Sequence, residues 1–320
     1  MELLKECRIC PRKCGVNRYK TKGMCGANNK IKLAYYSLHK WEEPVISGKN
    51  GSGTIFFSNC NMKCIYCQNK KISIDGYGKY ISNKKLGEIM LELQKKKAHN
   101  INLVTPTHYV PQIARILHKI KDKELKIPVV YNTSSYENVG TIMMMRNLVD
   151  IYLADLKYYD DELAKKYSFC ENYFEVATMA IDEMYRQVGK FELDKKGMMK
   201  RGLIVRVLIL PDHIDDSKKI IEYLHKTYED DIFISIMNQY TPVNKCSYEN
   251  LNRKITEEEY DSVINYAVDL GVTNAFIQEG DTQDESFIPN FNKNIIKYCD
   301  FFMKFIIFCY YYYIFMLSFT

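Results

Sequence analysis

Several features that often reveal where a protein works are missing from this sequence of 320 residues. The first residues, MELLKECRIC, contain no apolar run of signal-peptide length, so we expect a cytoplasmic protein. The net charge of +6 is spread along the chain without a stripe of Lys and Arg, so we expect no nucleic-acid partner. The six histidines form no H-x-x-x-H or similar pair of metal ligands.

Long disordered regions and internal repeats are also missing. Hydrophobic residues make up 47% of the chain and charged residues 26%, which is ordinary for a globular protein. Eleven cysteines are the unusual feature of the composition. In a chain without export signals, this number indicates metal binding rather than a disulfide framework, because the cytosol keeps thiols reduced.

The C-terminal end carries no charge from residue 305 to 320, and with residues 301–304 it approaches the length that spans a bilayer. A tail anchor is one interpretation. The run is short, contains four consecutive tyrosines and lacks a basic cluster after it. We therefore favour a packing or non-functional hydrophobic extension over residues 292–320, and membrane contact through it stays an open alternative.

The middle of the chain alternates between strand-like and helix-like segments. Short apolar runs rich in Ile, Val and Leu predict strands over residues 54–59, 100–105, 128–133, 150–156, 203–210 and 232–238, with a seventh run, TNAFIQE, after the last helix. Segments between them repeat apolar residues at spacings of three or four, which predicts amphipathic helices. This alternation predicts an α/β fold with a parallel sheet, and either a doubly wound sheet or a barrel fits it.

Three cysteines, Cys60, Cys64 and Cys67, follow the first predicted strand with the spacing C-x3-C-x2-C. Thiolates are the ligands of 4Fe-4S clusters, and three of them leave one of the four irons without a protein ligand, where chemistry can occur. Loops at the carboxyl ends of parallel strands are also where α/β barrels place their active sites. The alternative is a structural zinc loop, although zinc usually needs a fourth Cys or His, and none follows closely.

From these residues outward, the chain resembles radical S-adenosylmethionine (SAM) enzymes, in particular the homologues of pyruvate formate-lyase activating enzyme. The resemblance covers residues 7 to about 291. It is carried by the cysteine triplet with Tyr66 before its third cysteine, and by the segments CRICPRKCGVNR, EEPVISG, GSGTIFFSNCN, NINLVTPTHY, VVYNTSSYE, VDIYLADLKY, IVRVLILP and ISIMNQYTP.

The resemblance implies a partial (β/α)6 TIM-like barrel over residues 54–291. It implies that Cys60, Cys64 and Cys67 hold a 4Fe-4S cluster whose open iron binds SAM. Reductive cleavage of SAM would then give methionine and a 5′-deoxyadenosyl radical, which takes a hydrogen atom from the substrate.

The family's SAM-binding stretches indicate further candidates at the strand ends. Thr105, Pro106 and Thr107 stand where the family usually has Gly-Gly-Glu, and a proline turn that opens a helix is an equal alternative there. Asn132, Thr133 and Ser134 resemble its Asp-Thr-Asn stretch.

The strands that follow supply the charged candidates. Asp155 and Lys157 match the family's Asp-Leu-Lys motif, although the two side chains could instead form a structural bridge. Arg206 interrupts an apolar strand, where an unpaired charge is costly, so we expect it to contact the SAM carboxylate. Gln239 is a weaker candidate for the ribose or adenine, since single polar residues are common at strand ends.

Residues 1–53 contain a second group of cysteines, Cys7, Cys10, Cys14 and Cys25, and predict a small cysteine-rich cap. Four soft ligands within nineteen residues close the coordination shell of a metal. Structural zinc and a fully ligated auxiliary 4Fe-4S cluster both fit this spacing.

Three functions follow as hypotheses. The first is activation of a glycyl radical enzyme, a protein substrate, with electrons from a flavodoxin- or ferredoxin-like donor that could meet Lys63, Lys70 and Lys71 beside the cysteine triplet. The second is a radical SAM enzyme that acts on another macromolecule or on a small molecule. The third is a zinc-stabilised binding module without SAM chemistry.

Overall fold

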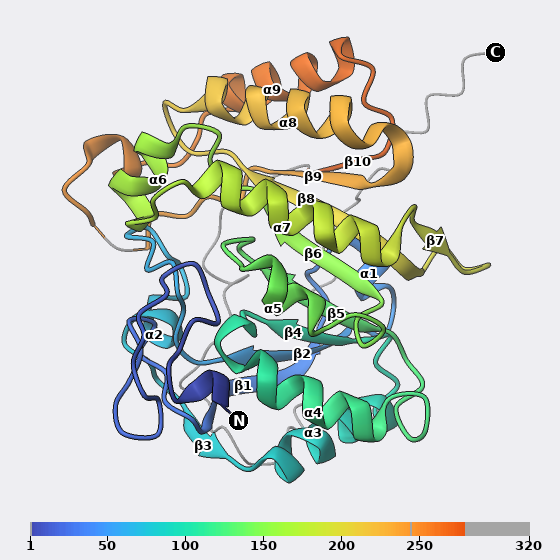
Figure 1. Ribbon diagram of the computed structural model, residues 1–320. Helices are drawn as coiled ribbons and strands as arrows, with labels where there is room; N and C mark the ends of the chain where they lie inside the picture. Colours follow the sequence, from blue (N-terminus) through green and yellow to red (C-terminus); the bar gives the residue numbers. More distant parts are fainter. Residues whose placement is uncertain (1, 244, 279–320) are drawn as a thin grey trace, which may run out of the picture.

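The computed structural model describes residues 2–243 and 245–278. Its sheet contains a run of seven strands that are all parallel to their neighbours in the order β10-β9-β8-β6-β5-β4-β2 (Figure 1). Their bounds are Ser52–Phe57 (β2), Ile101–Val104 (β4), Val129–Thr133 (β5), Ile151–Asp155 (β6), Met199–Leu208 (β8), Phe233–Met237 (β9) and Ala275–Ile277 (β10). The α/β fold with a mostly parallel sheet is thus confirmed, and each of the seven predicted runs forms a strand.

Amphipathic helices connect the parallel strands and lie along one side of the sheet in Figure 1. They are α3 (Asn83–Lys95), α4 (Val110–Ile120), α5 (Val139–Met143), α6 (Asp161–Ser168), α7 (Tyr173–Val188), α8 (Ile214–Tyr228) and α9 (Glu257–Asp269). Two single turns stand apart from this layer: α1 (Pro44–Ser47), which packs on the opposite face of the sheet, and α2 (Lys70–Ser73), which follows β2. Local sequence sets where the helices begin. The Ser82 side chain accepts a hydrogen bond at the start of α3, and Thr256 and Glu259 form a reciprocal capping box at the start of α9.

Three strands were not predicted. The longest, β1 (Ile31–His39), pairs antiparallel with β2, while β3 (Lys79–Ile81) pairs with β1, and β7 (Glu192–Leu193) pairs with β8. Most side chains of β1 beyond Ala34 are only half-buried, which is why its sequence lacks the apolar run of the other strands. The sheet therefore includes residues on both sides of the cap boundary expected at residue 53, and the division into a cap and a barrel stays a prediction.

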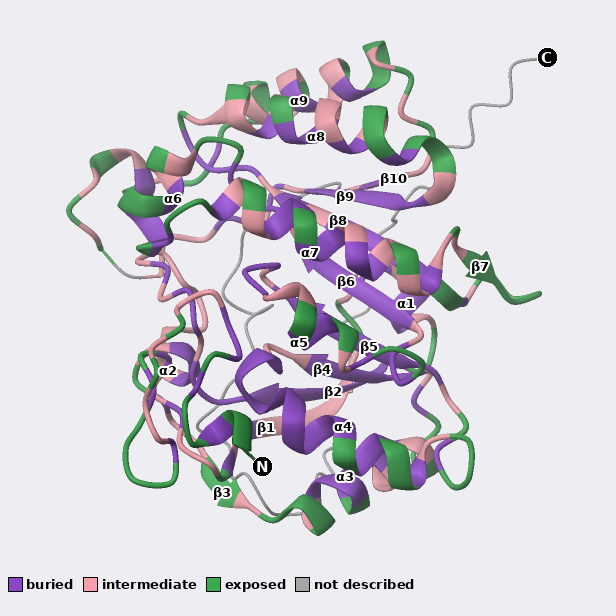
Figure 2. Cartoon of the chain, viewed as in Figure 1, coloured by how far each residue is buried: buried purple, intermediate pink, exposed green. Residues whose placement is uncertain are grey.

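The parallel strands are buried on both faces, as Figure 2 shows by their predominantly purple ribbons. On one face Ile55, Leu103 and Val205 belong to the main core with the helices. On the other face Val130, Leu153 and Ile204 pack with residues of α1. This second core includes Ile151, Met199 and Phe233, the first residues of β6, β8 and β9, whereas a cavity lies at the carboxyl ends of the strands.

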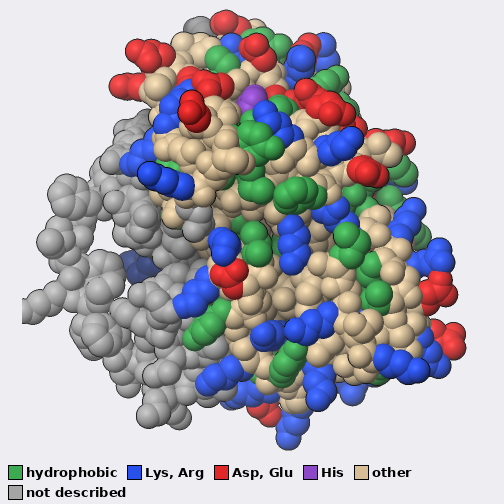
Figure 3. Space-filling view, turned by 90° about the vertical axis from the view of Figure 1, so that its left-hand side faces the viewer, with side chains coloured by type: hydrophobic (Ala, Val, Ile, Leu, Met, Phe, Trp, Pro, Cys, Tyr) green, Lys and Arg blue, Asp and Glu red, His purple; other side chains and the backbone are tan. Residues whose placement is uncertain are grey.

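The surface carries scattered charge. On the face drawn in Figure 3, Lys and Arg side chains are spread among acidic, apolar and neutral groups. Among residues 2–243 and 245–278, no helix is both long enough and apolar enough to cross a membrane. The hydrophobic extension expected over residues 292–320, and the last predicted barrel residues before it, lie outside the described residues.

Candidate active site

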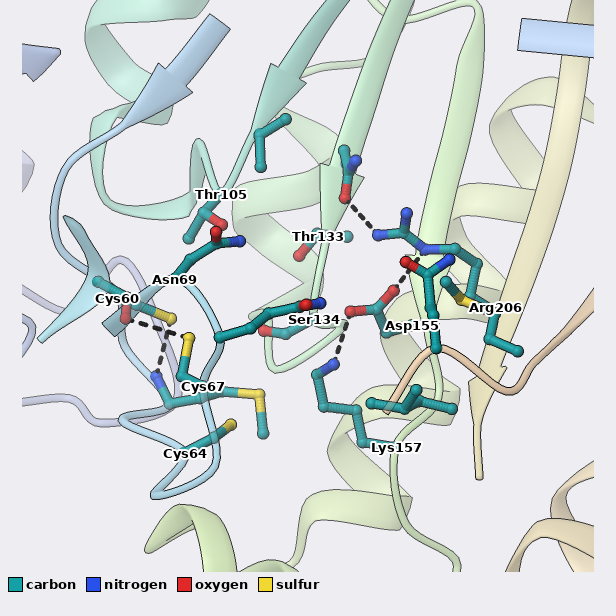
Figure 4. Close-up of a pocket in the computed structure, with 18 of the residues that line it drawn as sticks. Cys60, Cys64, Cys67, Asn69, Thr105, Thr133, Ser134, Asp155, Lys157 and Arg206 are labelled. Atoms are coloured by element: carbon teal, nitrogen blue, oxygen red, sulfur yellow. Dashed lines mark hydrogen bonds and ion pairs between the residues drawn. The ribbon is translucent and has the colours of Figure 1, made fainter. Parts of the chain in front are cut away.

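The candidate site is built around a cysteine loop, residues 58–69, that connects β2 to α2. Asn59 and Lys63 adopt left-handed backbone conformations, with φ of 77° and 68°, and these turn the chain sharply. The Asn59 amide donates a hydrogen bond of 2.7 Å to the Ile72 carbonyl, which holds the two ends of the loop together. Cys60, Cys64 and Cys67 all line one cavity at the carboxyl ends of the strands (Figure 4).

Each of the three sulfur atoms accepts a hydrogen bond from the protein. The Met62 amide donates to Cys60 Sγ at 3.4 Å, the Ser168 hydroxyl to Cys64 Sγ at 2.9 Å, and the Ser73 hydroxyl to Cys67 Sγ at 3.2 Å. Burial raises the pKa of the Cys60 thiol to about 11 and also raises the pKa of Cys64 and Cys67. Bound metal cations would reverse this effect and deprotonate the thiols.

This donor set fits a 4Fe-4S cluster. The three thiols come from one loop, face one cavity and have hydrogen-bond donors placed to stabilise thiolates. In the described part of the chain, no three His, Cys, Asp or Glu side chains lie close enough together to chelate a single metal ion. Ligands to separate irons of one cube need not meet at a common ion, so the loop suits a cube better than one zinc ion.

Opposite the cysteine loop, a network of charged side chains occupies the cavity wall (Figure 4). Asp155 at the end of β6 stands opposite Arg206 of β8 in the parallel register. Arg206 Nε donates to Asp155 Oδ1 at 2.7 Å, and Lys157 Nζ lies 2.7 Å from Asp155 Oδ2. Arg206 Nη2 also donates to the Asn132 side-chain carbonyl at 2.8 Å.

The network determines the charge of its members. Burial opposes ionisation of Asp155, but Arg206 and Lys157 together hold the pKa of this carboxyl below its ordinary value. Burial would also lower the pKa of Lys157, and the Asp155 carboxylate raises it instead. All three groups are therefore ionised at neutral pH. The bridge between Asp155 and Lys157, which the sequence left open as the alternative to SAM binding, is present inside the cavity.

Two carboxyl groups in this wall were missed by the sequence analysis. Glu42 accepts hydrogen bonds from Arg206 Nη1 at 3.3 Å and from the Asn102 amide at 3.0 Å. Glu43 is 5% exposed, and its Oε2 atom has no hydrogen-bond partner. Burial raises the pKa of both carboxyls. Both residues belong to the segment EEPVISG. In the sequence, two adjacent glutamates before a proline are typical of a solvent-exposed turn, and only the structure places Arg206 beside them.

Most of the predicted SAM-binding residues meet at this cavity. Those that line it together with the three cysteines are Thr105, Asn132, Thr133, Ser134, Asp155, Lys157, Arg206 and Gln239. Thr105 has a φ of 56°, a strained conformation for a β-branched residue. Pro106 and Thr107 do not line the cavity and instead open a short 3-10 helix, Thr107–Tyr109, that leads into α4. The individual contacts with SAM stay predictions.

Thr107 has a different partner, the buried Glu137. Glu137 Oε1 accepts hydrogen bonds from the hydroxyls of Thr107 at 2.6 Å, Thr133 at 2.7 Å and Tyr131 at 3.0 Å. Burial raises the pKa of this carboxyl to about 7, although the three hydroxyls oppose the shift. The cluster ties the ends of β4 and β5 together behind the cavity wall.

The four cysteines of the cap lie near one another but outside the cavity. Cys7, Cys10 and Cys25 are buried. A Cβ atom built on Gly23 would lie 3.4 Å from Cys25 Sγ and 3.5 Å from Cys14 Sγ, so both sulfurs lie beside this glycine. Burial raises the pKa of Cys10 to about 12, with smaller contributions from the Cys25 and Cys7 thiols nearby. Among the described residues these cysteines do not come close enough together to chelate one metal ion, so the metal of the cap stays a prediction.

Arg12 connects the cap to the cysteine loop. It lies between Cys10 and Cys14, and its guanidinium donates to the Asn61 carbonyl at 2.9 Å and the Met62 carbonyl at 3.1 Å. The same group donates to the Ser168 carbonyl at 3.1 Å and to the Phe169 carbonyl at the end of α6. One side chain of the cap therefore holds together two segments that border the site.

Replacing Arg12 by alanine is expected to destabilise the metal-loaded protein by about 2 kcal/mol or more, since hydrogen bonds to charged groups contribute about 1.5–3 kcal/mol and the carbonyls lose their partner. Lysine should rescue only part of this loss, because it lacks the planar guanidinium fork. Anaerobic chemical denaturation measures the effect.

Arg8→Ala is the matched control, because Arg8 is exposed and its side chain bonds Glu6. Equal stability of Arg12→Ala and Arg8→Ala would contradict the role of Arg12.

Comparison with known proteins supports the interpretation of this cavity as a radical SAM site. Residues 54–189 match the radical SAM superfamily. An uncharacterized protein of Methanocaldococcus jannaschii is 32% identical over 279 residues, which cover 83% of this chain and 75% of the relative. The chain belongs to the radical SAM superfamily, whose members are enzymes that use SAM and a 4Fe-4S cluster. A zinc-stabilised binding module without SAM chemistry is therefore not supported.

Solved structures align with the chain at low sequence identity. Streptococcus suis SuiB bound to S-adenosylmethionine aligns with a TM-score of 0.48 and 11% identity, over 70% of this chain and 49% of that chain. Methylornithine synthase aligns with a TM-score of 0.43 and 14% identity, over 68% of this chain and 60% of that chain. The chain thus spans about half of SuiB and three fifths of methylornithine synthase.

Proposed function

We propose that the protein activates a glycyl radical enzyme by taking a hydrogen atom from a glycine Cα of that partner. The observation that supports it is the shape of the site. The two edge strands β10 and β3 are not paired with each other in the described residues, so the barrel is partial. Gln278 beyond β10 and Trp41 beyond β1 both line the cavity, and Trp41 is 46% exposed at its mouth. A loop of a folded partner could enter between these edges.

We assign a different role in this reaction to each group of residues in the cavity. A 4Fe-4S cluster held by Cys60, Cys64 and Cys67 would supply the electron that cleaves SAM into methionine and the 5′-deoxyadenosyl radical. We assign the amino acid moiety of SAM to Asp155 and Lys157, and its carboxylate to Arg206. Gln239, which is half-buried at the other side of the cavity, is assigned to the ribose or adenine. These side chains orient SAM, and apolar residues that also line the cavity, such as Phe57 and Val104, exclude water.

The electron would come from a flavodoxin- or ferredoxin-like protein. Lys63 lies in the cysteine loop, and Lys70 and Lys71 follow it directly. These lysines contribute positive charge there, although Lys70 also forms an ion pair of 2.9 Å with Asp75. Acidic electron carriers are attracted to such a surface.

A second candidate is a radical SAM enzyme that acts on another macromolecule or on a small molecule. The observation that favours it is Glu43. Its unpartnered Oε2 lies buried in the cavity wall, where a donor group of a small substrate could pair with it.

Transfer of a label from the partner distinguishes the two candidates. The reduced holoprotein is incubated anaerobically with SAM and with a candidate glycyl radical enzyme that is deuterated at glycine Cα. We expect deuterium in the 5′-deoxyadenosine, measured by mass spectrometry, and a glycyl radical signal in the partner.

A partner variant that lacks the reactive glycine is the matched control, and it should transfer no label. Label that enters only from a small metabolite would overturn the activase proposal and support the second candidate.

A further inference from the structure

A chain of hydroxyl groups leads from the cavity to the sulfur of Cys64. The Tyr66 hydroxyl lies 2.6 Å from the Tyr158 hydroxyl, which lies 2.7 Å from Ser168 Oγ. Ser168 Oγ lies 2.9 Å from Cys64 Sγ. Tyr158 and Ser168 are fully buried, while Tyr66 is half-buried and lines the cavity.

A thiolate at the end of this chain would fix the direction of every bond in it. A metal-bound Cys64 thiolate can only accept, so the single Ser168 proton must point at the sulfur. The Ser168 oxygen then accepts from Tyr158, and the Tyr158 oxygen accepts from Tyr66. Each hydroxyl donates once and accepts from its neighbour, apart from Tyr66 at the cavity end, and burial keeps water from competing for the inner bonds.

The fold holds Ser168 rigidly beside the cysteine loop. Ser168 is the last residue of α6, and Phe169 ends the helix in a left-handed conformation with a φ of 53°. The Ile65 amide of the cysteine loop donates to the Tyr167 carbonyl at 2.9 Å, and Arg12 binds the Ser168 carbonyl. Tyr158 packs edge-on against Tyr173 at 5.4 Å. The backbone on both sides of the Ser168–Cys64 contact is therefore tied down independently of the hydroxyl.

We propose that Ser168 is a positioning residue that raises the reduction potential of the cluster held by Cys60, Cys64 and Cys67, and that Tyr158 and Tyr66 keep its hydroxyl aimed at Cys64. Reduction adds negative charge to the cluster, and a hydrogen bond to a ligand sulfur stabilises the more negative state. The inference rests on the assignment of the chain to the radical SAM superfamily. It gives a role in electron transfer to a residue that is not itself a ligand of the cluster.

The test is an anaerobic potentiometric titration of the cluster in the holoprotein, followed by electron paramagnetic resonance. Iron and sulfide content are measured for every variant first. Ser168→Ala is expected to shift the midpoint potential to a more negative value at unchanged iron content. Ser168→Thr keeps the hydroxyl and should restore the wild-type potential. Tyr158→Phe leaves Ser168 without its donor and should give a smaller shift in the same direction.

Two matched controls remove a hydroxyl elsewhere. Ser217→Ala changes a buried serine of α8, and Tyr185→Phe removes a hydroxyl that bonds Asp231 at 2.6 Å. Both should keep the wild-type potential.

An unchanged potential in a fully loaded Ser168→Ala protein would overturn the proposal. If that variant assembles no cluster, Tyr158→Phe decides, because an unchanged potential there overturns it equally and a negative shift supports it. A wild-type protein that binds no 4Fe-4S cluster would contradict the assignment of the site itself, which is a different result.

Discussion

Replacing any one of Cys60, Cys64 and Cys67 by alanine is expected to abolish the reductive cleavage of SAM. Each thiol supplies one ligand of the cube, and no other cysteine of the described chain lines the cavity to take its place. The product 5′-deoxyadenosine, measured by chromatography after anaerobic incubation with SAM and dithionite, should fall to the level of a protein-free control. Iron content should fall with it, because the thiolates hold the cluster.

Cys246→Ala is the control for this series. Cys246 is half-buried outside the cavity, and its thiol donates to the Tyr248 carbonyl at 3.5 Å. We expect this variant to retain cleavage at the wild-type rate. Release of 5′-deoxyadenosine by the triple variant at Cys60, Cys64 and Cys67 would show that the loop does not hold the reactive cluster.

Replacing Arg206 by methionine is expected to cost about 3–5 kcal/mol of folding free energy, because removal of one partner leaves buried charges without compensation. Asp155 would keep only Lys157, and Glu42 would keep only the Asn102 amide. SAM binding, measured by equilibrium dialysis, should be lost as well, since the proposed carboxylate contact disappears. Anaerobic denaturation at several pH values measures the stability change.

The pH dependence separates a charge effect from a packing effect. Arg206 helps to lower the pKa of Asp155, and this stabilises the folded protein at pH values above the ordinary carboxyl pKa of about 4. The stabilisation disappears as the pH falls through the lowered pKa. The difference between wild type and Arg206→Met should therefore be largest near neutral pH and shrink in acid.

The matched control is Arg201→Met on the same strand. Arg201 is exposed, and its guanidinium bonds the Val188 and Gln187 carbonyls at 2.9 Å and 2.6 Å. Its loss should cost about 1–2 kcal/mol, with little dependence on pH. A pH-independent loss in Arg206→Met of the same size would contradict the buried charge network.

The fold was predictable because its signals are local. Strands covered on both faces by helices and an inner core must be apolar along their length, so β2, β4, β5, β6, β8 and β9 are visible as runs. The strand β1 was missed because its side chains beyond Ala34 are only half-buried, so its sequence contains no continuous apolar run. The cysteine loop was recognisable because its three cysteines lie within eight residues, so their spacing can be read from one short segment of the sequence.

The candidates at the strand ends were predictable for a related reason. Parallel strands bring their carboxyl ends to one edge, so Asn132, Asp155 and Arg206 could be expected to meet once the strands were placed. Their partners were not predictable in the same way. Glu42 lies 164 residues from Arg206 in the sequence, and nothing near either residue indicates the other. The same proline turn that replaces the family's Gly-Gly-Glu stretch moves Thr107 away from the cavity.

By itself, the sequence determined the class of chemistry, because the cysteine triplet and the apolar strands are encoded over short distances. Only the tertiary structure decided what surrounds that chemistry. Arg12 and Ser168 meet the cysteine loop from segments about 50 and 104 residues away, and each looks like an ordinary surface or helix residue in the sequence. Hydrogen bonds of this kind depend on how the segments pack, and packing is a property of the whole chain rather than of any one segment.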